Sequence, residues 1–354
     1  MLIAETDHRL IDAQVAQKGG RYACPACKEP VRLRHGQRIP PYFAHLPHSQ
    51  CQIASEHESR QHMQGKRQLA SFFSAWGPVR LEEVLPAIQQ RADVWVTHGQ
   101  RPLALEFQCS PINDTQVLLR TQGYARLGVA MGWLLGKRYD QQGLSLGLIQ
   151  RFAAVRGQWG LCLLFWDVGR QQLRVVHHLY QDVLGHCWGT TAWITRLDQF
   201  VQGRPRMTPP ARPNWPQFRR QLQQRLWRSD ARLRPLQEEL YLRGQNLATF
   251  PQMLMSDQAT WPLFGQGEVY WRILMISRLF SETELITPDR VLELGQAVFD
   301  QTGGHMAGAG FTCPDVIGHA IRDLLRVAVN HGYLVPGSGG WRVAKQPTWS
   351  AGVA

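Results

Sequence analysis

The chain has 354 residues, of which 44% are hydrophobic, and its formal net charge is +12. A positive surplus of this size favours a polyanionic partner, most simply nucleic acid, with an anionic membrane surface as the alternative. No apolar run approaches the length of a bilayer span and the first residues lack a signal-peptide pattern, so we expect a cytoplasmic protein. In a reducing compartment its seven cysteines act as thiols or metal ligands rather than as disulfides.

The first 54 residues contain a candidate zinc site, which follows one or two loosely alternating strands in residues 2–15. A CPAC knuckle brings two thiolates to one edge of a metal, and tetrahedral zinc needs two more ligands. Histidines and a third cysteine follow at a spacing that fits a small zinc ribbon. The candidate ligands are Cys24, Cys27, His45 and Cys51, with His48 as the alternative to His45. We predict a zinc-ribbon-like module with structural Zn²⁺; a knuckle that holds no metal is the other interpretation.

Residues 55–76 are predicted to form a helix, with Ser55 as its N-cap and Glu58 as a capping-box acid. Glu58, His62 and Lys66 are four residues apart each time, so they share one stripe of the helix. The stripe either adds a carboxylate and a cation to a neighbouring site or forms a solvated, ion-paired face. The sequence favours neither interpretation.

A strand at residues 79–85 precedes a predicted hairpin at residues 90–110, whose two strands are joined by the turn HGQRP. Glu106 and Gln108 point to one face of the second strand, and hairpin pairing brings Asp93 towards that face. A carboxylate inside the apolar run LALEF is costly to bury without a partner. Because Mg²⁺ prefers carboxylate oxygens, Asp93 and Glu106 are predicted ligands of Mg²⁺ or Mn²⁺. A surface hairpin with solvated acids is the alternative.

A second helix is predicted at residues 114–127, capped by Asp114 or Thr115, with Arg120 and Tyr124 on one face. Arg120 is a candidate to contact the scissile phosphate or to orient the hairpin glutamate, and Tyr124 is a second DNA-contact candidate. An exposed helix arginine is the alternative. After a buried strand at residues 129–136, the core reads helix, strand, strand, strand, helix, strand. Three strand-like runs between residues 144 and 176 extend it.

The segment from residue 203 to 243 is basic, with ten arginines against three acids. It opens with a linker rich in proline and arginine and continues as helices from residue 215. Arginines interleaved with aromatic residues suit single-stranded nucleic acid, where bases stack on the rings and arginines follow the backbone. The aromatic residues are Trp215, Phe218 and Trp227, and the DNA-contact candidates are Arg219 and Arg220. The alternative is a pair of helices with core-facing rings and solvated arginines.

The last part, from residue 266, reads as three helices followed by a hairpin. This is the pattern of a winged helix, a module that docks on DNA or on proteins. His319, Arg322 and Arg326 lie on the candidate recognition helix, and Arg342 lies on the wing. Because many winged helices bind proteins or only pack, DNA contact here rests on analogy of fold.

The motifs CPAC, YFAH, ESRQHMQGKRQL, LPAIQQRADV, LALEFQCSPI and RTQGYARLGVAMGWLLG follow one another up to about residue 180. In sequence and order they resemble the competence protein CoiA family. The resemblance implies a nuclease-like domain of the PD-(D/E)XK restriction-endonuclease superfamily, beside a zinc-ribbon-like N-terminus. It also implies a role in natural transformation, where incoming single-stranded DNA is processed and recombined into the chromosome.

The resemblance places the superfamily's metal-binding acids on Asp93 and Glu106, and the helix carboxylate of some members on Glu58. The lysine that usually follows the glutamate by two residues is Gln108 here. A lysine stabilises developing charge, whereas glutamine positions a water without adding charge. Lys66 is the candidate cation that replaces it. These five residues form the predicted catalytic set.

We therefore predict an α/β protein with a restriction-endonuclease-like core, a central mixed sheet flanked by helices. The predicted parts are a zinc-ribbon-like module (1–54), the nuclease core (55–180), a basic linker and arm (181–265) and a winged-helix-like region (266–354). The predicted function is metal-dependent hydrolysis of DNA, in single strands, with recombination proteins as further partners. The alternatives are a catalytically inactive single-stranded-DNA-binding or recombination scaffold and an RNA-processing enzyme.

Overall fold

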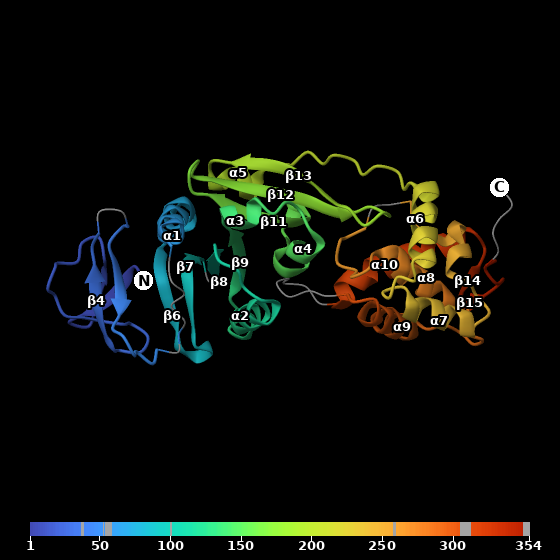
Figure 1. The fold of residues 1–354 in the computed structure, drawn as a ribbon, viewed down its shortest axis with the longest axis horizontal. Helices are drawn as coiled ribbons and strands as arrows, with labels where there is room; N and C mark the ends of the chain where they lie inside the picture. The colour runs from blue at the N-terminus through green and yellow to red at the C-terminus, as the bar shows by residue number, and fades with distance from the viewer. Residues whose placement is uncertain are drawn as a thin grey trace. The chain divides into compact units, whose positions relative to one another are not determined.

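The contacts within the chain divide it into two units (Figure 1). Unit 1 comprises residues 1–143, 151–177 and 191–205, and unit 2 comprises residues 144–150, 178–190 and 206–354. The computed structural model describes residues 1–36, 39–51, 53, 59–99, 101–257, 260–304 and 313–349. The predicted division into four parts stays a prediction.

A small antiparallel sheet forms the N-terminal part of unit 1, with the strand order β2-β1-β3-β4-β5. Its strands are β1 (Ile3–Thr6), β2 (Arg9–Asp12), β3 (Tyr22–Ala23), β4 (Pro30–Arg34) and β5 (Tyr42–His45). One side of the sheet buries Tyr22, Val31 and Phe43, and the rings of Tyr22 and Phe43 lie 4.9 Å apart. The strands predicted in residues 2–15 are confirmed as β1 and β2.

A larger, mixed sheet follows, with the strand order β13-β12-β11-β9-β8-β7-β6 and a short β10 beside β11. Its strands are β6 (Val79–Leu85), β7 (Gln90–His98), β8 (Arg101–Gln108), β9 (Ala130–Leu135), β10 (Ala154–Val155), β11 (Leu161–Asp167), β12 (Gln172–Gln181) and β13 (Cys187–Ile194). The hairpin β7–β8 is antiparallel, whereas β9 pairs in parallel with both β8 and β11. The predicted mixed sheet is confirmed.

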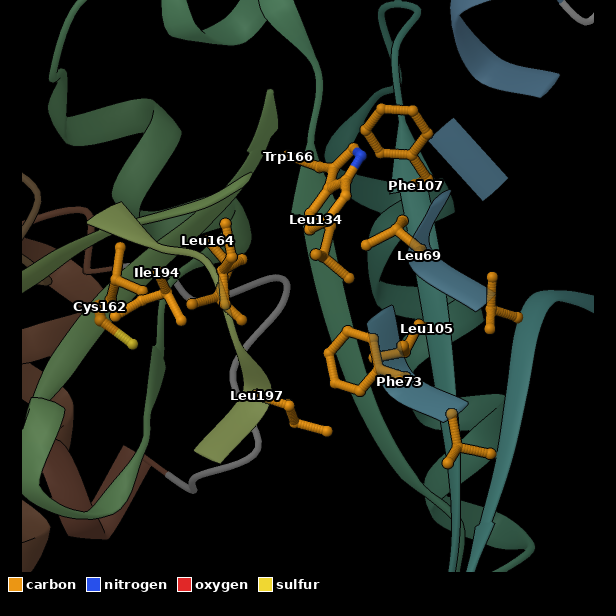
Figure 2. Close-up of a cluster of buried hydrophobic side chains, with 14 of the residues drawn as sticks. Leu69, Phe73, Leu105, Phe107, Leu134, Cys162, Leu164, Trp166, Ile194 and Leu197 are labelled. Carbon is orange, nitrogen blue, oxygen red and sulfur yellow. The ribbon is translucent and has the colours of Figure 1, made fainter. Parts of the chain in front are cut away.

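Helices cover both faces of this sheet because the apolar side chains of β8 alternate. Leu105 and Phe107 face α1 (Arg60–Phe73), where they pack with Leu69 and Phe73 (Figure 2). Ala104 instead packs with Tyr124 of α2 (Asp114–Arg126). The predicted order of the core is thus confirmed as α1, β6, β7, β8, α2, β9. Three short helices lie between or after the strands of this sheet in the chain: α3 (Lys137–Asp140), α4 (Leu146–Phe152) and α5 (Leu197–Gln202).

Three predictions of local structure were wrong. Helix α1 starts at Arg60, where the Ser59 side chain accepts a hydrogen bond from the His62 N–H, so Ser55 is not its cap. Helix α2 is capped by Asn113 rather than by either predicted residue. The first of the three predicted strand-like runs, residues 144–155, is mostly the helix α4, because its apolar residues are spaced for a helix as well as for a strand.

Unit 2 is mainly helical. Besides most of α4, its helices are α6 (Trp215–Trp227), α7 (Arg234–Leu242), α8 (Glu268–Leu279), α9 (Pro288–Gln301) and α10 (Cys313–Asn330). Its C-terminal hairpin is β14 (Leu334–Gly337) with β15 (Gly340–Val343). The three C-terminal helices and the hairpin occur where they were predicted, while their assignment as a winged helix stays a prediction. In the part of the chain that the structure describes, each helix is too short or too polar to cross a bilayer.

Candidate functional site

Four metal-ligating side chains converge in the N-terminal sheet. The ligand atoms of Cys24, Cys27, His45 and Cys51 all lie within 4.8 Å of one another. The Cys27 Sγ lies 3.4 Å from the His45 Nε2, and the Lys28 N–H donates to the Cys24 carbonyl at 2.9 Å, which closes the turn of the knuckle. His45 ends strand β5, whereas His48 is outside the cluster. The geometry therefore selects His45 from the two predicted alternatives.

The donor types of the cluster fit a zinc ion. Burial, with smaller contributions from the Cys51 and Cys24 thiols, raises the pKa of the Cys27 thiol to about 12, so a bound cation would be needed to hold it as a thiolate. Burial also lowers the pKa of His45, which favours the neutral imidazole that ligates metals. Three thiols and a neutral imidazole at this spacing are a tetrahedral donor set for Zn²⁺, which ligates thiolates. The cluster can therefore hold a structural zinc ion.

The second site lies where the two strands of the central hairpin separate. Pairing of β7 with β8 extends to Val94 and Leu105, and the next pair in the same register is Asp93 with Glu106. Instead of a backbone pairing at this point, the Phe107 N–H donates to the Asp93 Oδ2 at 2.9 Å. Both carboxylates line one open cavity of about 310 Å³. Asp93 and Glu106 therefore lie near each other, as predicted, at the point where the backbone pairing of β7 with β8 ends.

Asp93 is held by groups of helix α1. The His62 Nε2 lies 3.1 Å from the Asp93 Oδ2, and the Lys66 Nζ lies 3.8 Å from the Oδ1. Burial alone would raise the pKa of Asp93, but His62, followed by Lys66 and Arg120, outweighs it and holds that pKa below its usual range. These cations therefore favour the ionised form of Asp93. The third carboxylate predicted for this site, Glu58, lies outside the described residues.

Lys66 has a second and closer partner, which sequence reasoning missed. Its Nζ lies 2.5 Å from the Oε1 of Glu82 on strand β6, and both side chains are completely buried. The Ile3 N–H donates to the other oxygen of Glu82 at 3.2 Å, so this acid also ties the N-terminal sheet to the core. A signal was present: Lys66 lies three residues from both Met63 and Leu69, on the apolar face of the helix, where a lysine needs a buried partner.

Glu106 is held by helix α2 on the opposite face of the sheet. An Nη of Arg120 donates to the Glu106 Oε2 at 2.6 Å and to the Arg91 carbonyl at 3.2 Å. The Tyr124 hydroxyl donates to the other carboxylate oxygen. Burial, together with the nearby Asp93, still raises the pKa of Glu106. Arg120 thus makes the contact expected of a residue that orients Glu106, and contact of Arg120 or Tyr124 with DNA stays a prediction.

Gln108, at the position of the usual lysine, also lines the cavity. Its amide donates to the Ser110 carbonyl at 2.8 Å, and the side chain is buried. The cationic residues along the same cavity are Arg91, Arg120 and Arg138. Two carboxylates beside a cavity that has room for several waters have the donor chemistry of a hydrated Mg²⁺ site. Among the described residues, however, only the N-terminal cluster brings three or more metal-ligating groups together.

Of the arginines predicted to bind DNA in unit 2, two are bonded to other protein groups and two have exposed side chains. Arg219 donates hydrogen bonds to the Ala248 carbonyl at 3.2 Å and to Gln252 at 3.1 Å. Arg326 pairs with Asp323 at 2.6 Å. Arg220 and Arg322 are exposed. Of the two interpretations of Trp215 and Phe218, the core-facing one is confirmed, because both rings are buried in the packing of unit 2.

Comparison with known proteins identifies two adjoining domains. The nuclease-like domain of competence protein CoiA matches residues 58–195, and the N-terminal domain of competence protein CoiA matches residues 6–54. Together the two matches cover more than half of the chain. The first includes the whole carboxylate cavity, and the second includes the Cys/His cluster.

Two curated relatives are similar over shorter stretches. Competence protein CoiA of Bacillus subtilis (strain 168) is 34% identical over 131 residues, which are 36% of this chain and 35% of that protein. Druantia protein DruB of Escherichia coli (strain UMEA 4076-1) is 60% identical over 38 residues, 11% of this chain and 7% of that protein. The chain thus matches about a third of the length of the first relative and less of the second. No solved structure matches the chain.

Proposed function

Because the chain belongs to the competence protein CoiA family, we propose that it is a metal-dependent deoxyribonuclease that processes incoming DNA in natural transformation. The observation that carries the proposal is the cavity at the end of the β7–β8 ladder. There, within the nuclease-like domain, Asp93, whose pKa is held low by its cationic neighbours, and Glu106 lie beside three arginines. Acids that ligate a metal, next to guanidinium groups that attract phosphate, are the parts that phosphodiester hydrolysis requires.

The charged and polar residues at the cavity have the following proposed tasks. Asp93, Glu106 and, from the adjoining segment, Glu58 would hold Mg²⁺ or Mn²⁺. The bound ion supplies a Lewis acid and lowers the pKa of a coordinated water. His62 and Lys66 keep Asp93 charged, while Arg120 and Tyr124 fix the carboxylate of Glu106 in position. Gln108 orients a water molecule, and the arginines along the cavity neutralise the substrate phosphate.

The proposed substrate is single-stranded DNA, the form that the family handles in transformation, with recombination proteins as further partners. The Cys/His cluster would hold a structural Zn²⁺. In unit 2, the exposed Arg322 and, once freed from Asp323, Arg326 are proposed to contact DNA from a winged-helix-like arrangement. A cytoplasmic location is part of the proposal.

Cleavage of labelled DNA tests the proposal. The full chain would be incubated with single- and double-stranded DNA and an RNA of the same sequence, with Mg²⁺ or Mn²⁺. We expect metal-dependent cleavage that is lost in Asp93→Ala and Glu106→Ala, since each removes a ligand. Glu83→Ala is the matched control, because Glu83 is an acid of strand β6 that pairs with Arg80 and does not line the cavity. Cleavage that survives loss of either strand acid would refute the assigned site, and preferred cleavage of RNA would refute the assigned substrate.

A second candidate function is DNA binding without cleavage. It is favoured by the neutral Gln108 at the lysine position and by the two hydrogen bonds that already engage the oxygens of Glu106. Tight binding of single strands without cleavage in either metal, unchanged by Asp93→Ala, would establish this function instead.

A further inference from the structure

Helix α6 of unit 2 has one exposed face that the nuclease proposal leaves without a role. Its apolar residues Trp215, Phe218 and Leu222 are buried on the opposite side. The exposed residues follow helical spacing along α6 and its C-cap, and they are Pro216, Arg220, Gln223, Gln224, Trp227 and Arg228. The Trp227 side chain is 84% exposed, although its indole is the largest apolar side chain in the protein repertoire. Among the residues that the structure describes, no aromatic ring or cation packs on this indole, so it is available as a contact surface.

The charge of this face is not compensated. Helix α6 contains three arginines and no acid. Arg219 and Arg225 are used within the unit: Arg225 pairs with Asp230 at 2.7 Å and donates to the Tyr270 hydroxyl at 2.7 Å. By contrast, within the described ranges, Arg220 and Arg228 have neither an ion pair nor a side-chain hydrogen bond. The two free guanidinium groups therefore lie on the same exposed surface as Trp227.

We propose that this α6 face binds single-stranded DNA, with a base stacked on Trp227 and phosphates contacted by Arg220 and Arg228. Stacking needs an aromatic face in reach of an unpaired base, and guanidinium groups suit phosphate. Arg220 and Trp227 are seven residues apart, about 10 Å along the helix axis, so one strand can contact both. The inference rests on the proposed function only in taking DNA as the substrate.

The composition of the face argues against other anionic partners. A helix that lies on a membrane buries a broad apolar stripe beneath its basic residues. Here the apolar stripe of α6 is already buried within unit 2, and the exposed face carries one aromatic ring among glutamines and arginines. A duplex keeps its bases stacked on one another, so it can use the arginines of this face but not the indole.

Binding of a fluorescent thymidine 20-mer to the full chain, without added Mg²⁺ or Mn²⁺, tests the proposal. Since no cleavage is needed, the result is independent of nuclease activity. Trp227→Ala should weaken binding about 5- to 150-fold, the range measured when one stacking aromatic is removed. Arg220→Gln and Arg228→Gln should each make the log–log salt slope shallower by about 0.7, because each loses one phosphate contact on a single strand.

Matched controls lie on helix α7. Tyr241→Ala removes an aromatic side chain that is 80% exposed, and Arg234→Gln removes an exposed arginine that pairs with Glu238. Both should bind the 20-mer within about twofold of the wild type, and thermal unfolding should show that all variants fold equally well. Equal loss of affinity in Trp227→Ala and Tyr241→Ala overturns the proposal. So does a duplex that binds as tightly as the single strand, or a loss of anionic-vesicle binding in the α6 variants while DNA binding is unchanged.

Discussion

The buried pair of Lys66 and Glu82 gives the sharpest stability prediction for unit 1. The side chains are 0% and 1% exposed, and the Nζ–Oε1 distance is 2.5 Å. Removing one partner of a buried pair costs about 3–5 kcal/mol, because the other charge stays buried without compensation. We expect Lys66→Met to lower the free energy of unfolding by about this amount, which is a large share of the about 5–15 kcal/mol of a typical domain.

The direction in which the stability lost in Lys66→Met changes with pH follows from the pKa of Glu82. In the wild type, burial tends to raise the pKa of Glu82, but Lys66 and then Arg91 outweigh it and lower that pKa below its usual value of 4.5. The pair therefore stabilises the fold fully above pH 4.5, and the contribution is lost as the pH falls towards the lowered folded-state pKa. In Lys66→Met burial dominates and raises the pKa of Glu82. The unfolding free energy of the variant should therefore rise, relative to the wild type, as the pH falls from 7 to 5.

Urea unfolding followed by circular dichroism at pH 7 and pH 5, with zinc present, measures both effects. The double variant Lys66→Met/Glu82→Leu should recover to within about 1 kcal/mol of the wild type, since replacing both ions by apolar groups is close to neutral. Lys28→Met is the control, because Lys28 pairs with Glu5 at the surface and should cost less than about 1 kcal/mol. A double variant that costs as much as the two single variants together would refute the reasoning.

Three further predictions concern packing and metal binding. Cys24→Ser, or zinc chelation, should unfold the N-terminal sheet and leave most of the core's circular dichroism intact; elemental analysis without zinc and unchanged stability would contradict it. Gly65→Ala should destabilise unit 1 by about 1–3 kcal/mol in urea unfolding, because a Cβ would lie 2.0 Å from the ring of Phe107, and an unchanged midpoint would refute this. Tyr124→Phe should cost about 1–3 kcal/mol in the same assay, because buried Glu106 loses a donor, and a neutral effect would show that the bond contributes nothing.

The sequence predicted the elements of the core because their signals are local. Alternation within LALEF placed Glu106 on the face opposite Phe107, and the structure has them facing α2 and α1 respectively. The CPAC knuckle and the following histidines predicted the cluster that the structure brings together. Hairpin pairing also placed Asp93 near Glu106, since register is set by the turn and the apolar pattern.

What the sequence did not predict depends on contacts between distant segments. The strand VRLEEVL contains two adjacent acids and no local signal that separates them, and only the packing of α1 on β6 shows that Glu82 faces Lys66. Trp215 and Phe218 could be either stacking rings or core rings on the sequence alone, and their packing against Phe250 decides between the two interpretations. The strand β13 was missed because its sequence, CWGTTAWI, does not alternate apolar with polar residues and the strand is mostly exposed or half-buried.

The positions of the cations argue for a charge arrangement that differs from the superfamily pattern. Where the lysine usually lies, Gln108 donates to Ser110 and adds no charge. Lys66 has no exposed surface and lies between Glu82 and Asp93, so we infer that its charge serves to keep Asp93 ionised. The cations that line the cavity come instead from β7, α2 and α3. Under the proposed function, the forked N–H groups of these arginines would neutralise a phosphate that enters the cavity, and Gln108, two residues after Glu106, would orient water.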